Sequence, residues 1–243
     1  AVLTVAIIGW LFSRNIPDAV PSAPDTKIRY NFIAETFSQV SHARKNRDVF
    51  IAIIAISWFW YVGATVLTLL PPISDETFSG SAYIYTVLLT FLSLGIGIGS
   101  ILCDKLVGSL KSGNFLVPIG AIGLALFAID FYFAASHMAQ ISSGLIDHTF
   151  NGKQLVSVSS FLSSFTAWRI LFDLTLFGIS AGFYIVPLYV MLQQRSDVKH
   201  RSRMIAVNNI MNALFIVASS IAGLVLKKWF SLNEIIVGIS FGM

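Results

Sequence analysis

The sequence predicts an all-α, polytopic membrane bundle, and three observations predict it. Of the 243 residues, 56% are hydrophobic and only 12% are charged, whereas a soluble domain carries about 25% charged residues. The apolar residues form long continuous runs, and not the ~10-residue alternating segments of an outer-membrane barrel. Because continuous runs of this kind cross a bilayer as helices, we expect helical spans. The basic residues gather in a few loops between the runs.

The chain divides into seven apolar segments. They are residues 1–13, 49–70, 82–103, 114–136, 166–192, 204–226 and 232–243. The middle five each have about the 20 residues that a membrane span needs. The second segment is expected to stop at Pro71 and Pro72, since proline interrupts a helix. The first segment opens without Met and the last is about half a span long, so we expect a fragment cut inside a helix at both ends.

The positions of Lys and Arg predict the orientation. Twelve of the sixteen lie in loops 14–48, 104–113 and 193–203, three lie in the loops of the opposite side, and Arg169 lies inside a segment. By the positive-inside rule, the three rich loops are expected to be cytoplasmic. The net charge of +4 therefore indicates topology and not a nucleic-acid partner, and the partner implied by composition is the lipid bilayer.

We predict further structure in two of the loops, 14–48 and 137–165. In the first loop, RNIPDAVPSAPD holds three prolines and is not expected to be helical. Residues 31–48 are expected to form an amphipathic helix on the membrane surface, with Phe32, Phe37 and Val40 toward lipid. The serine-rich loop 137–165 on the opposite side has room for a short helix, and we assign it no chemistry.

Three ionisable residues fall within the apolar segments: Asp130, Arg169 and Asp173. A charge at mid-bilayer costs ~2.5–3.5 kcal/mol on insertion scales, so charges there usually have partners. Arg169 and Asp173 are four residues apart on one helix face, and Asp130 lies at a similar depth in the preceding segment. We expect one charge cluster, acting either as a gate, proton site or headgroup contact, or as a structural clamp.

Polar side chains also recur at helical spacing on three segments. These stripes are Ser57, Tyr61, Thr65 and Thr68; Arg169, Asp173, Ser180 and Tyr184; and Asn208, Asn212, Phe215 and Ser219. Such stripes face protein or a water-filled cavity. One interpretation is hydrogen bonding between helices, worth ~0.6 kcal/mol on average; the other, favoured by three stripes together, is a shared polar cavity.

The sequence contains two glycine pairs with helix-packing spacing and lacks the motifs of disulfides, metal sites and several enzyme classes. Gly95 with Gly99 and Gly178 with Gly182 form GxxxG pairs, which favour close helix packing. Cys103 is the only cysteine, so no disulfide is expected. The four histidines, at 42, 137, 148 and 200, show neither metal-ligand spacing nor the HxxxxD pattern of acyltransferases, and there is no GxxxxGK[ST] phosphate loop. We therefore expect no enzyme, no metal and no cofactor.

Two sets of motifs resemble a known family. Residues 99–113, GSILCDKLVGSLKSG, resemble the short basic loop motif of the major facilitator superfamily. Asp104 and Lys105 keep its acidic-basic pair, Gly108 is its later glycine displaced by one position, and Ser100 replaces the earlier glycine. Four stretches resemble the lysophospholipid-transporter branch of that superfamily, and the resemblance covers nearly all of the chain. They are SRNIPDAVPSAPD, VFIAIIAISWFWYVGA, GIGIGSILCDKL and GFYIVPLYVMLQQRS…HRSRMIAVNNIMNALF.

The resemblance implies the second half of a carrier. Residues 1–48 would be the end of span six and the cytoplasmic linker, and residues 49–243 would be spans seven to twelve, the last truncated. The family moves lysophospholipids across the bacterial inner membrane by alternating access, partnered by an N-terminal six-helix half and, in some relatives, a fused acyltransferase. From polarity and depth, we expect the headgroup to meet Arg169, Asp173, Tyr61, Tyr184, Asn208 and Asn212.

Two alternatives stay open. One is a proton-coupled carrier of a small polar solute that uses Asp130 or Asp173. The other is a membrane scaffold that transports nothing and docks an acyltransferase through loop 14–48 or 193–203.

Overall fold

The computed structural model describes residues 2–15, 32–109, 115–150, 152–197, 200–240 and 242. The helices are α1 (Val2–Ser13), α2 (Phe32–Ala43), α3 (Arg47–Pro72), α4 (Ala82–Ser109), α5 (Leu116–Ile141), α6 (Val158–Ser163), α7 (Phe165–Arg195), α8 (Arg201–Leu226) and α9 (Leu232–Ser240). A hairpin of β1 (His148–Phe150) and β2 (Lys153–Leu155) is the one sheet of the described chain. The predicted all-α helical bundle is confirmed.

Five helices are long and apolar enough to cross a membrane. They begin at Arg47, Ala82, Leu116, Phe165 and Arg201, and they correspond to the five middle segments predicted from the sequence. The predicted first and last segments are the shorter helices α1 and α9. Hydropathy and length therefore located every apolar helix of the described chain.

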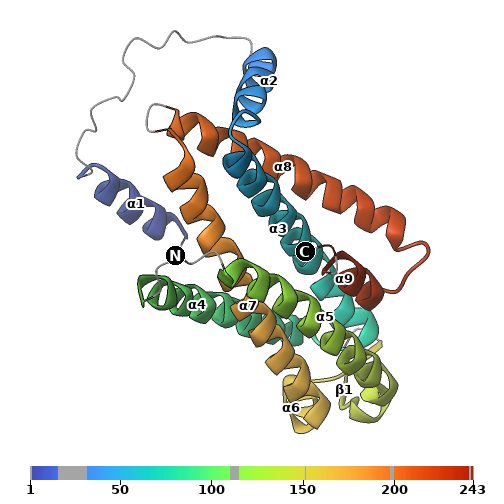
Figure 1. Ribbon diagram of the computed structural model, residues 1–243. Helices are drawn as coiled ribbons and strands as arrows, with labels where there is room; N and C mark the ends of the chain where they lie inside the picture. Colours follow the sequence, from blue (N-terminus) through green and yellow to red (C-terminus); the bar gives the residue numbers. More distant parts are fainter. Residues whose placement is uncertain are drawn as a thin grey trace.

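Helix α7 is the centre of the bundle. It packs most extensively against α4 and α5 and also contacts α3, which in turn packs against α8 (Figure 1). Helix α9 lies against α5 and α3. The largest fully buried side chains come from several elements: Ile53, Ile56 and Leu70 lie on α3, Ile170 and Leu171 on α7, and others on α4 and α5.

The contact of α7 with α4 is made by backbone against backbone. A Cβ added at Gly178 would lie 2.5 Å from the Leu92 carbonyl oxygen, and one at Gly182 would lie 2.6 Å from the Ser100 nitrogen. A Cβ on the facing glycines, Gly95 and Gly99, would likewise meet the backbone of α7. The predicted GxxxG packing is confirmed.

At the basic end of the bundle, side-chain contacts join α3 to α7. Asn46 caps α3 by accepting a hydrogen bond from the Val49 amide over 3.3 Å, as short polar side chains do at helix starts. Its amide nitrogen donates to the Arg195 carbonyl oxygen over 3.1 Å, and Arg195 pairs with Asp48 over 3.1 Å. These bonds hold the start of α3 against the end of α7.

Two helix boundaries differ from the sequence predictions. Pro71 and Pro72 lie inside α3, and a π-helical turn (Ile73–Thr77) follows them. Helix α4 continues to Ser109, so Asp104 and Lys105 of the predicted loop motif are helical and exposed, and Gly108 is helical too. Ile73 and Ser74, which follow the prolines, are buried in the bundle, so packing keeps this part of the chain helical, whereas Asp104 and Lys105 belong to an exposed end of α4.

The surface helix also ends early. Helix α2 stops at Ala43 and α3 begins at Arg47. Phe37 is exposed as predicted, whereas Val40 packs against the core and does not face lipid. The Phe32 side chain and the proline-rich residues 16–25 lie outside the described part of the chain.

The loop at the opposite end contains more structure than the sequence predicted. After a 3-10 turn (Ser142–Leu145) come the β-hairpin and α6. The hairpin is fixed to the start of α4 by the Ser81 amide, which donates to Val156 O over 3.0 Å, and by the Val156 amide, which donates to Ser79 O over 2.8 Å. Lys153 also forms a 2.5 Å ion pair with Asp75 in the π-helical turn.

Asp147 closes this hairpin through its charge, which makes the hairpin sensitive to acid. Its carboxylate accepts hydrogen bonds from the Ser157 hydroxyl, from His148 Nδ1 over 2.9 Å and from the Ser157 amide over 2.9 Å, and these lower the pKa of Asp147 from 3.8 to about 2. Because the folded pKa is the lower one, the stabilisation is complete above pH 3.8 and is lost as the pH falls through about 2.

Asp147→Asn is expected to loosen the hairpin at neutral pH. Hydrogen exchange followed by mass spectrometry should show faster exchange across residues 147–157, with the rest of the bundle unchanged. The matched control is Asp104→Asn at the other end of the molecule, where the side chain is exposed. Equal exchange in the wild type and in Asp147→Asn would contradict the prediction.

Candidate functional site

The charged pair Asp130–Arg169 connects α5 and α7 on the surface of the bundle. Arg169 Nε donates to Asp130 Oδ2 over 3.2 Å, and Arg169 Nη2 donates to Asp130 Oδ1. Two parallel hydrogen bonds of this kind fix the geometry of a guanidinium and a carboxylate. The pair is only partly covered, because 43% of the Arg169 side chain and 38% of the Asp130 side chain are exposed.

Local sequence determines where Arg169 lies. Ser164 caps α7 by accepting a hydrogen bond from the Thr166 amide over 3.2 Å, so Arg169 falls in the second turn, about 6 Å from the helix start. The Thr166 hydroxyl also contacts His137 Nδ1 of α5 over 2.9 Å. This contact holds α5 and α7 together beside the pair. The His137–Thr166 contact was not predicted from the sequence, because His137 belongs to no recognisable sequence motif.

Asp173 completes the predicted cluster from a buried position. It lies one turn after Arg169 and is 1% exposed. Its carboxyl is within hydrogen-bonding reach of Asp130, whereas its Oδ2 atom has no hydrogen-bond partner among the described residues. The structure therefore brings the three predicted charges together, with two at the surface and one inside.

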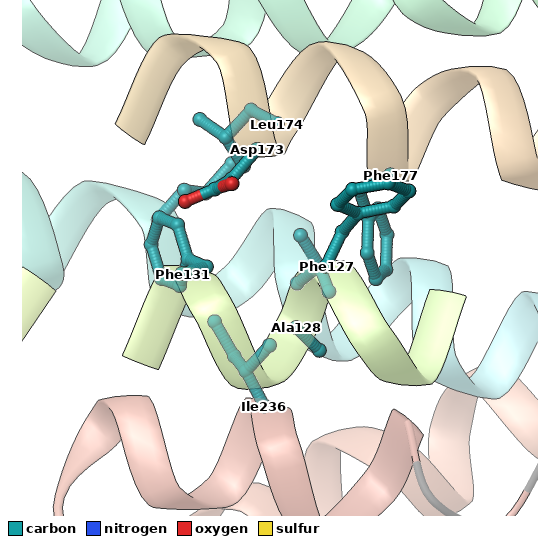
Figure 2. A pocket seen from close by; sticks show the side chains of 9 residues that line it. Phe127, Ala128, Phe131, Asp173, Leu174, Phe177 and Ile236 are labelled. Carbon is teal, nitrogen blue, oxygen red and sulfur yellow. The ribbon is translucent and has the colours of Figure 1, made fainter. Parts of the chain in front are cut away.

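A small apolar cavity adjoins Asp173 (Figure 2). Its volume is about 10 Å³, close to the ~10–15 Å³ that a single water molecule requires. It is lined by Val66, Leu70, Phe127, Ala128, Phe131, Leu174, Phe177 and Ile236 besides Asp173. Figure 2 shows the Asp173 carboxyl beside Phe131, with Ile236 of α9 approaching from the far side.

Large exposed apolar side chains surround the charged pair on its own helices. Phe133 follows Asp130 by three residues on α5, and Leu126 precedes it by four; both are more than half exposed. On α7, Phe172 follows Arg169 by three residues and is 62% exposed. Residues three or four apart share a helix face, so the pair forms a polar spot within an apolar surface.

The predicted amide residues lie in another part of the bundle. Asn212 on α8 is buried, and its Oδ1 accepts a 3.0 Å hydrogen bond from the Ser57 hydroxyl on α3. Asn208 is fully buried one turn away, and neither of its amide atoms has a partner among the described residues. The Asn212–Ser57 bond fits the first of the two interpretations of the polar stripes, hydrogen bonding between helices, whereas Asn208 makes no such bond to the described residues.

The predicted tyrosines lie near the amides and not near the charges. The Tyr184 hydroxyl donates to Ala55 O over 3.4 Å, and the Tyr61 ring stacks on Trp58 with 4.9 Å between centroids. Helix α8 starts at the basic end of the bundle, and Asn212 lies about 16 Å along it. Helix α7 starts at the opposite end, and Asp173 lies about 12 Å along it, so the amides and the charges are at different heights in the bundle. The six predicted binding residues therefore form two groups.

The arrangement indicates what chemistry is available. The charged pair offers a guanidinium for an anion and a carboxylate for a cation, next to apolar side chains. Among the described residues, no group of three His, Cys, Asp or Glu side chains could hold a metal ion. The cavity beside Asp173 could not be predicted, because its walls come from four helices far apart in sequence.

No protein-family model matches the chain, and searches of the curated proteins and of the solved structures find no match. The class of protein rests on the fold and the site. The chain is an α-helical bundle with five helices of membrane-spanning length and composition, and it carries a charged pair on an apolar surface.

Proposed function

We propose that this chain is the second half of a major-facilitator carrier that moves lysophospholipid across the bacterial inner membrane by alternating access. One observation carries the proposal: the Asp130–Arg169 pair is exposed beside Phe133 and Phe172. A lysophospholipid needs a polar place for its phosphate headgroup and an apolar surface for its single acyl chain, and this surface offers both.

The roles follow from charge. Arg169 can hold a phosphate through two hydrogen bonds, and Asp130 is near enough to contact the amine of an ethanolamine headgroup. Asp173, Tyr184, Asn208 and Asn212 are buried, and Tyr61 is partly buried. These five would reach a headgroup only in a conformation in which the helices separate. The binding roles of the amides and tyrosines are therefore secondary in this proposal.

The glycine contacts support movement of this kind. Gly178 and Gly182 bring α7 against the backbone of α4 without interlocking side chains. Small residues at membrane-helix interfaces permit close approach, and two such helices can slide with few changes of side-chain rotamer. Alternating access requires relative movement of helices around a binding site.

The test is a transport assay on the full-length protein that contains this chain, reconstituted in lipid vesicles. Fluorescent lysophosphatidylethanolamine in the outer leaflet is removed by albumin, so the protected fraction measures transfer to the inner leaflet. We expect protected lysolipid to accumulate only in vesicles that contain the protein. Protein-free vesicles are the control, and labelled sugars and drugs form the comparison panel.

Each alternative gives a different result. A carrier of small polar solutes would take up members of the sugar or drug panel and leave lysolipid in the outer leaflet. A scaffold would move none of these compounds, and removal of any acyltransferase fused to the full-length protein would not change that. Transport of lysolipid after such a removal would exclude the scaffold.

A further inference from the structure

We propose that Asp173 is a proton-binding site that takes up a proton while α5 and α7 are packed together and releases it when they separate. The proposal stands on the burial of Asp173, its unpaired oxygen and its position behind the Asp130–Arg169 pair. It rests on the proposed carrier function only for the further step that links the proton to transport.

The immediate surroundings favour a neutral Asp173. The side chain is 1% exposed, and eight apolar residues line the cavity beside it. An ionised carboxylate in such a place costs several kcal/mol unless it is paired, and Asp173 Oδ2 has no partner among the described residues. A protonated carboxyl avoids this cost, because it carries no charge.

The neighbouring charges favour the same state. Arg169 already makes two hydrogen bonds to Asp130, so its positive charge is balanced before Asp173 is counted. A proton on Asp173 makes the three-residue cluster neutral, whereas an ionised Asp173 would leave a net negative charge among apolar side chains. A protonated Asp173 can also donate its O–H toward Asp130, which lies within hydrogen-bonding reach; two ionised carboxylates cannot form that bond.

Among the described residues that line the cavity, those from the other helices include no competing titratable group. Helix α5 contributes Asp130, and α7 contributes Arg169. The cavity-lining residues of α3 are Val66 and Leu70, and that of α9 is Ile236. Within the part of the chain that the structure describes, Asp173 is therefore the one cavity-lining residue that can bind or release a proton.

Separation of α5 from α7 would change these surroundings. The cavity has room for about one water molecule in the packed state, and wider opening would admit the several water molecules that solvate a carboxylate. The proton then leaves to solvent and Asp173 becomes ionised. A cycle of packing and opening would thus bind and release one proton for each turn of the carrier.

Infrared spectroscopy of the full-length protein tests the proton site without any substrate. A protonated carboxyl gives a carbonyl stretching band separate from that of carboxylates. We expect this band in the wild type at neutral pH, its loss in Asp173→Asn and its retention, with a shift in frequency, in Asp173→Glu. Asp147→Asn is the matched control and should keep the band unchanged, because Asp147 is exposed and ionised.

Transport measurements then test the coupling. Vesicles containing the protein and a pH-sensitive dye should show proton movement when lysolipid is added, and Asp173→Asn should reduce it to the protein-free background. The lysolipid transport rate should change by up to about tenfold per pH unit in the wild type and become independent of pH in Asp173→Asn, while Asp173→Glu keeps a pH dependence.

The two proposals fail in different ways. If the wild type has no protonated-carboxyl band, or if the band persists in Asp173→Asn, Asp173 is not a proton site, whatever the protein transports. If the band behaves as expected and no lysolipid moves, the proton site stands and the proposed substrate is wrong. Should Asp173→Asn fail to fold, Asp173→Glu decides the assignment, because an unshifted band there would place the proton on another residue.

Discussion

Replacing Gly99 by leucine is expected to force α4 away from α7 and to destabilise the whole bundle. A Cβ at Gly99 would lie 2.7 Å from the Ile179 Cα atom, and backbone cannot move aside as a flexible side chain can. The side chain would also lie in the seam that holds the central helix. Overpacking of a well-packed contact costs about 1–3 kcal/mol, and we expect the upper end of that range.

Gly97 offers a matched control two residues away on the same helix. A Cβ there meets no atom of the described residues within 4 Å, so Gly97→Leu should keep or slightly raise stability, since leucine has the better helix propensity. Thermal unfolding in detergent, followed by tryptophan fluorescence, should show a loss of roughly 6–12 °C for Gly99→Leu alone. Equal melting temperatures for the two variants would mean that α4 and α7 are not in close contact.

Arg169→Ala is expected to abolish most lysolipid transport. The substitution removes the guanidinium that would hold the phosphate, and hydrogen bonds to charged groups contribute about 1.5–3 kcal/mol, which corresponds to a roughly 10- to 100-fold loss of transport rate. Arg169→Lys keeps the positive charge but cannot form the two parallel hydrogen bonds of a guanidinium, so its lysolipid transport rate should lie between those of the wild type and Arg169→Ala.

Two comparison variants separate binding from folding. Arg195→Ala removes another exposed ion pair, the one with Asp48 at the basic end, and should leave transport unchanged. The double variant Arg169→Ala, Asp130→Ala removes both charges and should recover the stability lost in Arg169→Ala, about 1 kcal/mol for a pair this exposed, without recovering transport. Normal transport by Arg169→Ala in the assay described above would remove Arg169 from the proposed site.

The fold was predictable because its signal is local. Each membrane-length helix is an apolar run of adequate length, and a run is visible without knowing its neighbours. Helix boundaries were less predictable. Pro71 and Pro72 interrupt a helix in the middle, but near its end they are followed by a π-helical turn, and no local pattern signals that continuation.

The site was predictable only in part, for a physical reason. Arg169 and Asp173 share a face by spacing, and depth alone placed Asp130 beside them. The amides followed the same helical spacing, yet Asn212 bonds to Ser57 because α8 packs on α3. Which helix faces which is decided by packing across the bundle, and single-helix periodicity does not contain that information. The apolar wall around Asp173 depends on the same packing.

The paired prolines of α3 have a mechanical consequence. Proline has no N–H, so Pro71 and Pro72 leave the carbonyls of Leu67 and Thr68 without their usual helical donors. This end of α3 can bend while losing fewer hydrogen bonds than the rest of the helix. The Lys153–Asp75 ion pair attaches the hairpin to the turn that follows, so bending of α3 would carry the hairpin with it. The end of α3 and the β-hairpin would therefore move together as one hinged unit. The resistance of the proline-containing end of α3 to bending would set how readily this end of the bundle opens.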